Sequence, residues 1–92
     1  MDNLYVGQTV YFSRIIPTGD VYDLIDLKIR TVDKETKWFV GVDKKTRAAF
    51  LFHELDINNI IFFDRKNALN KVREAEKSRK VKVEVEDCLE DS

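Results

Sequence analysis

The stretch "VDKETKWFVGVDKKTR" (residues 32–47) contains two near-identical segments, "VDKETK" and "VDKKTR", whose starts lie ten residues apart. The Asp in each segment can accept hydrogen bonds from backbone N–H groups two residues ahead, and the Thr hydroxyl can close the other side. Each segment is therefore predicted to be a tight hairpin turn, with "WFVGVD" as the strand between them. Successive turns of a meander lie at opposite ends, so the lysines of the two turns form no single basic patch.

Strand patterns flank this stretch on both sides. Toward the N-terminus, Ile25, Leu27 and Ile29 alternate with charged residues, and a further strand at residues 8–13 precedes a Pro-Thr-Gly-Asp turn. Toward the C-terminus, "RAAFLFH" alternates in the same way and residues 60–63 form a short apolar run. Alternation predicts an inner face made of Val10, Phe12, Ile25, Leu27, Ile29, Trp38, Val40, Phe50, Phe52 and Ile61.

A helix is predicted to follow directly from the last strand, over residues 64–79. Its first residue, an Asp, is a good N-cap, and Pro and Gly are absent from the sixteen residues after it. Ala68, Leu69, Val72 and Ala75 recur at helical spacing and form one apolar stripe. We expect this stripe to cover an open end or the outer face of the sheet, with Leu69 in the core.

The order of strand, Pro/Gly loop, long strand, two hairpins and short last strand resembles that of SH3-like barrels over residues 6–63. The resemblance implies a mainly β fold with a C-terminal α-helix, built as a five-stranded antiparallel SH3-like barrel. The acidic and aromatic signature of eukaryotic SH3 domains is absent, so polyproline recognition is not expected. Since 92 residues suffice for one small core, residues 1–80 are predicted to form a single domain of barrel and helix.

Residues 81–92 form an acidic tail. The net charges of residues 1–63, 64–80 and 81–92 are −1, +4 and −4. In the tail, Val81, Val83 and Val85 alternate with charged residues, which is a strand pattern. Three fates stay open for it: an extra strand on the edge of its own barrel, an extra strand on a partner, and disorder.

The joint between the last strand and the helix, Phe-Phe-Asp-Arg at residues 62–65 followed by Ala68 and Leu69, carries a second resemblance. It is similar to the same joint in small SH3-like proteins of Gram-positive bacteria and their phages. That resemblance implies an accessory protein encoded by a phage or another mobile element, with no catalytic residues to transfer. Proteins of this class often block a host protein, and components of host defence are among the targets it implies.

No group of residues has the spacing of a catalytic, metal or cofactor site. His53, the only histidine, lies beside a turn, where a partly exposed surface role is expected. Asp23 and Asp26 fall on opposite faces of a strand, and the single Cys88 can form no internal disulfide. We therefore expect no enzyme, no cofactor and no small-molecule substrate. Without an apolar span or export signal, we expect a cytoplasmic protein that does not enter membranes.

Protein binding is the preferred function, with either another protein or a second copy as the partner. The residues expected to take part are outward-facing aromatic side chains and the valines of the tail: Tyr11, Tyr22, Phe39, Val81, Val83 and Val85. Nucleic-acid binding is the alternative, because a basic stripe on the predicted helix can follow a phosphate backbone. That stripe comprises Lys66, Arg73, Lys77 and Lys80. The net charge of −1 and the acidic tail weigh against this alternative.

Overall fold

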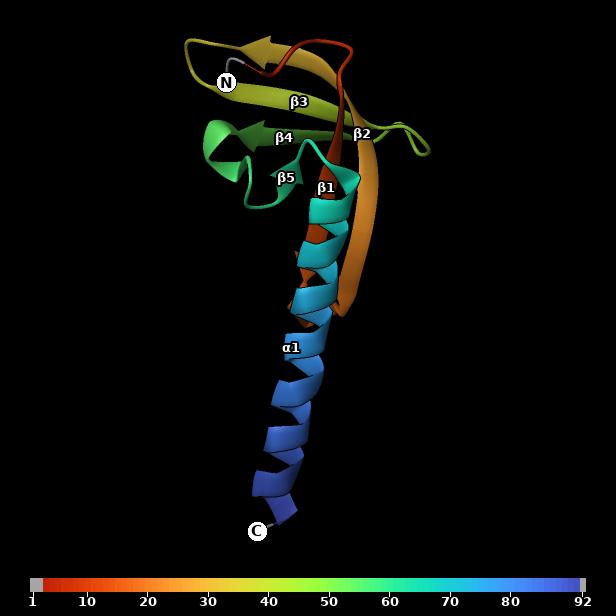
Figure 1. The fold of residues 1–92 in the computed structure, drawn as a ribbon, viewed down its shortest axis with the longest axis vertical. Coiled ribbons are helices and arrows are strands. Elements are labelled where there is room, and N and C mark those ends of the chain that lie inside the picture. The colour runs from red at the N-terminus through yellow and green to blue at the C-terminus, as the bar shows by residue number, and fades with distance from the viewer. Residues whose placement is uncertain (1–2, 92) are drawn as a thin grey trace.

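The computed structural model describes the backbone of residues 3–91 and the side chains of residues 3–78. Within residues 3–91, five strands, two short 3₁₀ helices and one long α-helix follow one another (Figure 1). In order they are β1 (Thr9–Ile16), η1 (Pro17–Gly19), β2 (Val21–Asp33), β3 (Trp38–Asp43), β4 (Ala49–His53), η2 (Glu54–Asp56), β5 (Ile61–Phe62) and α1 (Arg65–Asp91).

All five strands belong to one sheet in the order β4-β3-β2-β1-β5, and each neighbouring pair is antiparallel. The predicted five-stranded antiparallel sheet with a single C-terminal helix is thus confirmed. Strands β4 and β5 form the two edges, and no ladder joins them within residues 3–91. The sheet is therefore open, and its closure into a barrel stays a prediction.

The two repeated segments form equivalent turns, as predicted. Asp33 Oδ1 accepts hydrogen bonds from the N–H groups of Glu35 and Thr36, at 3.0 and 3.3 Å. Asp43 Oδ1 does the same for Lys45 and Thr46, at 2.8 and 3.4 Å. Each turn ends on a residue with a left-handed backbone, at Lys37 (φ 65°) and Arg47 (φ 67°). The shared sequence therefore produces shared backbone geometry at both ends of β3.

The inner face of β3 differs from the prediction. Phe39 is buried and lies opposite Phe52 of β4, whereas Trp38 is exposed on the outer face. Gly41 shares the inner face with Phe39, and a Cβ atom added to it would lie 2.9 Å from Leu27 Cδ1. Leu27 thus occupies the space beside the glycine, which sets the face that Phe39 shares. The prediction that Phe39 points outward, and Trp38 and Val40 inward, is wrong.

The core lies on the concave inner side of the sheet. It consists of Leu4, Val10, Ile25, Leu27, Ile29, Phe39, Phe52 and Ile61, with Phe12, Val32, Phe50, Ile57 and Ile60 packed around it. All of the predicted inner residues of β1, β2, β4 and β5 belong to the core or pack against it. The register of β2 against β3 shifts between Ile29 and Thr31, which marks a β-bulge in the long strand.

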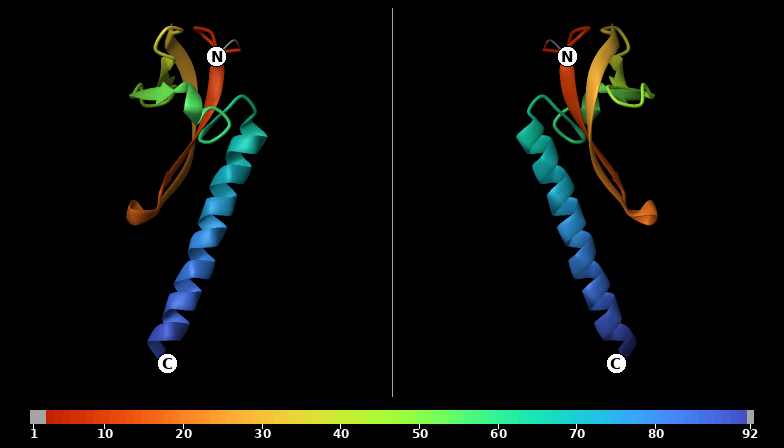
Figure 2. Two further views of the ribbon diagram at one scale, coloured as in Figure 1. Left: turned by 90° about the vertical axis from the view of Figure 1, so that its left-hand side faces the viewer. Right: turned by 90° about the vertical axis from the view of Figure 1, so that its right-hand side faces the viewer.

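Helix α1 packs on the opposite, outer side of β1 and β2 (Figure 2). Ser13 is fully buried there, and its Oγ donates a hydrogen bond to the Ala68 carbonyl oxygen at 2.7 Å. Ser13 follows the inward-facing Phe12, so it points to the outer face. Among the described side chains of the helix, Ala68 and Val72 are buried, whereas Leu69, which was predicted to be in the core, is only half-buried and lies outside it. The outer-face alternative for helix docking is therefore the one observed.

The backbone of residues 81–91 continues α1. This differs from the extra strand or disorder that the sequence analysis left open for the tail. The sequence has no Pro or Gly after Gly41, and a helix that has formed extends one residue at a time. A strand would instead need a neighbouring sheet edge. The side chains of Lys80, Val81, Val83 and Val85 lie outside the described residues.

Candidate functional site

The outer face of β3 and β4 carries apolar side chains that nothing covers in the described part of the chain. The register pairs Trp38 with His53 and Val40 with Leu51 on this face. Trp38 is 42% exposed and Leu51 65% exposed. The rings of Trp38 and His53 meet edge to face with centroids 4.8 Å apart. We call these four residues the β3–β4 patch.

The backbone of β4 has free hydrogen-bonding groups beside this patch. Two bonds enclose the ladder with β3, from Asp43 N–H to the Ala48 carbonyl (2.8 Å) and from Glu54 N–H to the Lys37 carbonyl (2.9 Å). Because bonded pairs alternate in an antiparallel ladder, residues 50 and 52 bond to β3. The N–H and C=O groups of Ala49, Leu51 and His53 consequently point away from the sheet.

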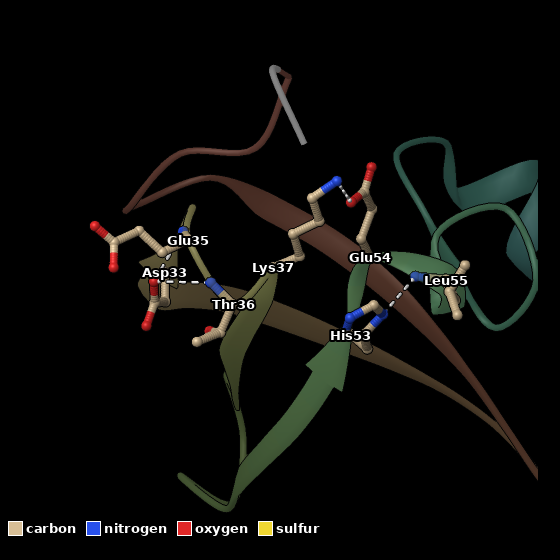
Figure 3. A network of polar contacts seen from close by, with 7 residues as sticks. All are labelled: Asp33, Glu35, Thr36, Lys37, His53, Glu54 and Leu55. Atoms are coloured by element: carbon tan, nitrogen blue, oxygen red, sulfur yellow. Dashed lines mark hydrogen bonds and ion pairs between the residues drawn. The ribbon is translucent and has the colours of Figure 1, made fainter.

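One of these groups is already satisfied. The His53 N–H donates to Asp56 Oδ2 at 3.0 Å, and His53 Nδ1 accepts from Leu55 N–H at 3.2 Å, which forms a reciprocal cap on η2. Figure 3 shows His53 turned toward Leu55, and Lys37 beside Glu54. Lys37 Nζ lies 3.5 Å from Glu54 Oε2. His53 therefore has a structural role at the end of β4. No group of metal-ligating residues is found among the described side chains.

The opposite edge of the sheet is closed by its own chain. Strand β5 has only two residues, and the loop before it folds back so that Asn58 N–H donates to the Ile61 carbonyl at 2.7 Å. An isolated parallel bridge joins Ile57 to Ile61. Short length and a covering loop are two common ways to protect an edge strand. Strand β4, "AFLFH", has neither, and it also lacks Pro, Lys and any acidic residue.

The predicted protein-binding residues are not brought together. Tyr11 and Tyr22 are half-buried on β1 and β2, on the side where α1 packs, and the Tyr22 hydroxyl is buried without a hydrogen-bond partner among the described groups. Phe39 is in the core and cannot present its ring to a partner. Sequence reasoning missed Leu51, whose signal was the uncharged strand "AFLFH" with apolar residues on both faces.

The predicted nucleic-acid stripe is placed only in part. Lys66, Arg73 and Lys77 are exposed on α1, and their spacing puts them on one side of the helix. A separate groove of about 310 Å³ is lined by Arg14, Lys44, Lys45 and Arg65, together with Asp23, Asp26, Asp43, Leu24, Ile25 and Thr46. Its charges nearly balance.

Two of the cations in this groove already have partners. Arg14 donates to Asp23 at 2.7 Å, and Lys44 Nζ donates to Thr9 Oγ1 at 2.7 Å. The groove therefore offers no concentrated positive charge to a phosphate.

Within residues 3–91, no helix combines the length and the apolar content that crossing a membrane requires. Comparison of the chain with protein-family models, with curated proteins and with solved structures finds no match.

Proposed function

We propose that this chain is a non-enzymatic, cytoplasmic protein-binding module that pairs the free edge of β4 with an extended segment of a partner. The observation that carries the proposal is the unprotected edge of β4, which lies directly beside the exposed β3–β4 patch. Strand addition of this kind draws affinity from backbone hydrogen bonds and specificity from alternate side chains.

The edge offers five backbone groups to such a partner: the N–H and C=O of Ala49 and of Leu51, and the C=O of His53. The partner's side chains would alternate between the two faces of the extended sheet. Those on the outer face would meet Leu51 and Trp38, which favours apolar residues at every second position of the partner.

The resemblance to phage-type SH3-like proteins extends this proposal to the biological role. The strand order β4-β3-β2-β1-β5 fits an SH3-like meander, and Phe62 and Phe63 stand at the strand-to-helix joint on which the resemblance rests. On that basis the module acts as an accessory protein of a phage or mobile element, and its targets include proteins of the host and of host defence.

The proposal is tested by affinity capture with three tagged forms of the full chain: wild type, Leu51→Lys, and Lys66→Glu with Lys77→Glu. The bait is exposed to lysates of host and phage-infected cells, with and without nuclease. We expect one set of proteins to be retained by wild type and by the helix variant and lost with Leu51→Lys. Because Leu51 is mostly exposed, its replacement leaves the fold intact.

The opposite pattern would favour nucleic-acid binding. In that case the helix variant loses its captured material, Leu51→Lys retains it, and nuclease releases it from the wild type.

A further inference from the structure

We infer that the segment which pairs with β4 is β4 of a second copy, arranged antiparallel about a two-fold axis at Leu51. This inference rests on the proposed strand-adding function and names its partner. It follows from three features of the edge: which backbone groups are free, which side chains come to face one another, and how charge is distributed at the two ends of the strand.

The free backbone groups match one another across this axis. Leu51 of each copy donates its N–H to the Leu51 carbonyl of the other, which forms two bonds. Ala49 of each copy donates to the His53 carbonyl of the other, which forms two more. The His53 N–H is not needed, and it is the one edge N–H that the chain has already bonded, to Asp56. All four free N–H groups of the two edges are thereby satisfied.

The side chains favour the same register. Leu51, the exposed large apolar residue of β4, faces its own copy, and Phe50 faces Phe52 twice on the inner side. The two β3–β4 patches merge into one apolar surface. A register centred on Phe50 also forms four bonds, but it places Arg47 opposite His53 and leaves Leu51 opposite the small Ala49.

The charges at the ends of β4 are complementary in this arrangement. Lys45 and Arg47 lie in the turn before β4, while Asp56 and Glu54, which also pairs with Lys37, lie in η2 immediately after it. Antiparallel pairing about Leu51 brings the basic turn of each copy to the acidic η2 of the other, at both ends. Such contacts at the rim of an interface steer association and fix its register.

The first test is sedimentation velocity of the full chain over a roughly thousandfold range of concentration, with a dimer as the expected product. Leu51→Lys is expected to raise the dissociation constant about tenfold or more, because each dimer loses two buried leucines and gains two facing charges. Val6→Lys is the matched control, since Val6 is 63% exposed and lies outside the edge. Added salt should weaken the dimer through its rim charges.

The second test does not depend on the lysine variant being folded. Leu51→Cys in a Cys88→Ser background should form a disulfide-linked dimer under mild oxidation, because Cα atoms of a bonded antiparallel pair are about 5.5 Å apart and disulfides span that distance. Val6→Cys in the same background should stay monomeric.

A wild-type chain that remains monomeric, or a dimer that Leu51→Lys leaves unchanged and Leu51→Cys does not cross-link, would overturn the inference. If the inference is overturned in this way but the wild-type protein still captures other proteins, and Leu51→Lys abolishes that capture, the proposed function stands. If it captures none, both fail.

Discussion

The outer face of the sheet has two halves, which are connected by the long strand β2. One half is covered by a helix and the other is exposed. Over β1 and the first part of β2, helix α1 buries Ser13, Ala68 and Val72. Over β3 and β4 no element packs in the described part of the chain, and Trp38 and Leu51 remain exposed. Helix α1 therefore covers one half of the outer face, and the other half stays apolar and exposed beside the open edge of β4. The uncovered half is therefore the place to look for a partner.

The largest expected effect tests the face assignment within the uncovered half. Phe39→Ala should lower the free energy of unfolding by about 3–5 kcal/mol, because Phe39 is fully buried and packs on Phe52. Trp38→Ala, one residue away on the outer face, should cost only about 1 kcal/mol. Urea unfolding of the two variants measures the difference. Equal losses would mean that the two faces of β3 are not distinguished as the structure shows.

That pair of residues also shows how far sequence reasoning reached. The repeated Asp-containing turns, the five strands and the helix were predictable, because each depends on residues that are close together in the sequence. The face of β3 was not, since "WFVGV" is apolar on both faces and alternation cannot choose between them. The choice comes from Gly41, which leaves space for Leu27 of the neighbouring strand.

The candidate site was hidden for a related reason. Whether a strand lies at an open edge depends on the order of strands and on what the loops cover, and these are properties of the whole fold. Phe39 was predicted at the surface and Leu51 was not predicted to matter. The repeated-turn pattern placed the strands correctly but carried no information about which edge stays free.

The next effect compares the two halves directly. Val72→Ala should lower the free energy of unfolding by about 2 kcal/mol, because it removes buried methyl groups from the covered half and leaves a cavity. Leu51→Ala removes more atoms from the uncovered half but should change stability by less than about 0.5 kcal/mol. The melts are run at low protein concentration so that self-association does not contribute. A larger loss for Leu51→Ala would mean that the patch is covered in the free chain.

A smaller effect is expected from Ser13, a polar side chain that is fully buried under the helix. Ser13→Ala removes the hydrogen bond to the Ala68 carbonyl and should cost about 1 kcal/mol. Ser78, which is exposed on the same helix, provides the control, and Ser78→Ala should be neutral or slightly stabilising. Thermal unfolding of both variants decides the point. If Ser13→Ala were as harmless as Ser78→Ala, the helix would not be held tightly against β1.

The smallest effect separates the halves by pH, because the uncovered half depends on carboxylates at both of its turns. Hydrogen bonds from the Thr36 backbone N–H, the Thr36 side chain and the Glu35 N–H hold the pKa of Asp33 below its ordinary value of 3.8. The Lys45 N–H is the main cause of the lowered pKa of Asp43. A lowered folded-state pKa means that the stabilisation is present above pH 3.8 and is lost as the pH falls below it.

Acid should therefore loosen the turns of β3 before it loosens the packing of Ser13, Ala68 and Val72 between helix and sheet, because those contacts are uncharged. Amide exchange followed by NMR along an acid titration should show Glu35, Thr36, Lys45 and Thr46 losing protection first. Asp33→Asn with Asp43→Asn keeps an oxygen acceptor at each turn but removes the ionisable group, so this early loss should no longer depend on pH. If the double variant followed the wild-type titration, carboxylates elsewhere would be responsible, and the two halves would not differ in how they are held.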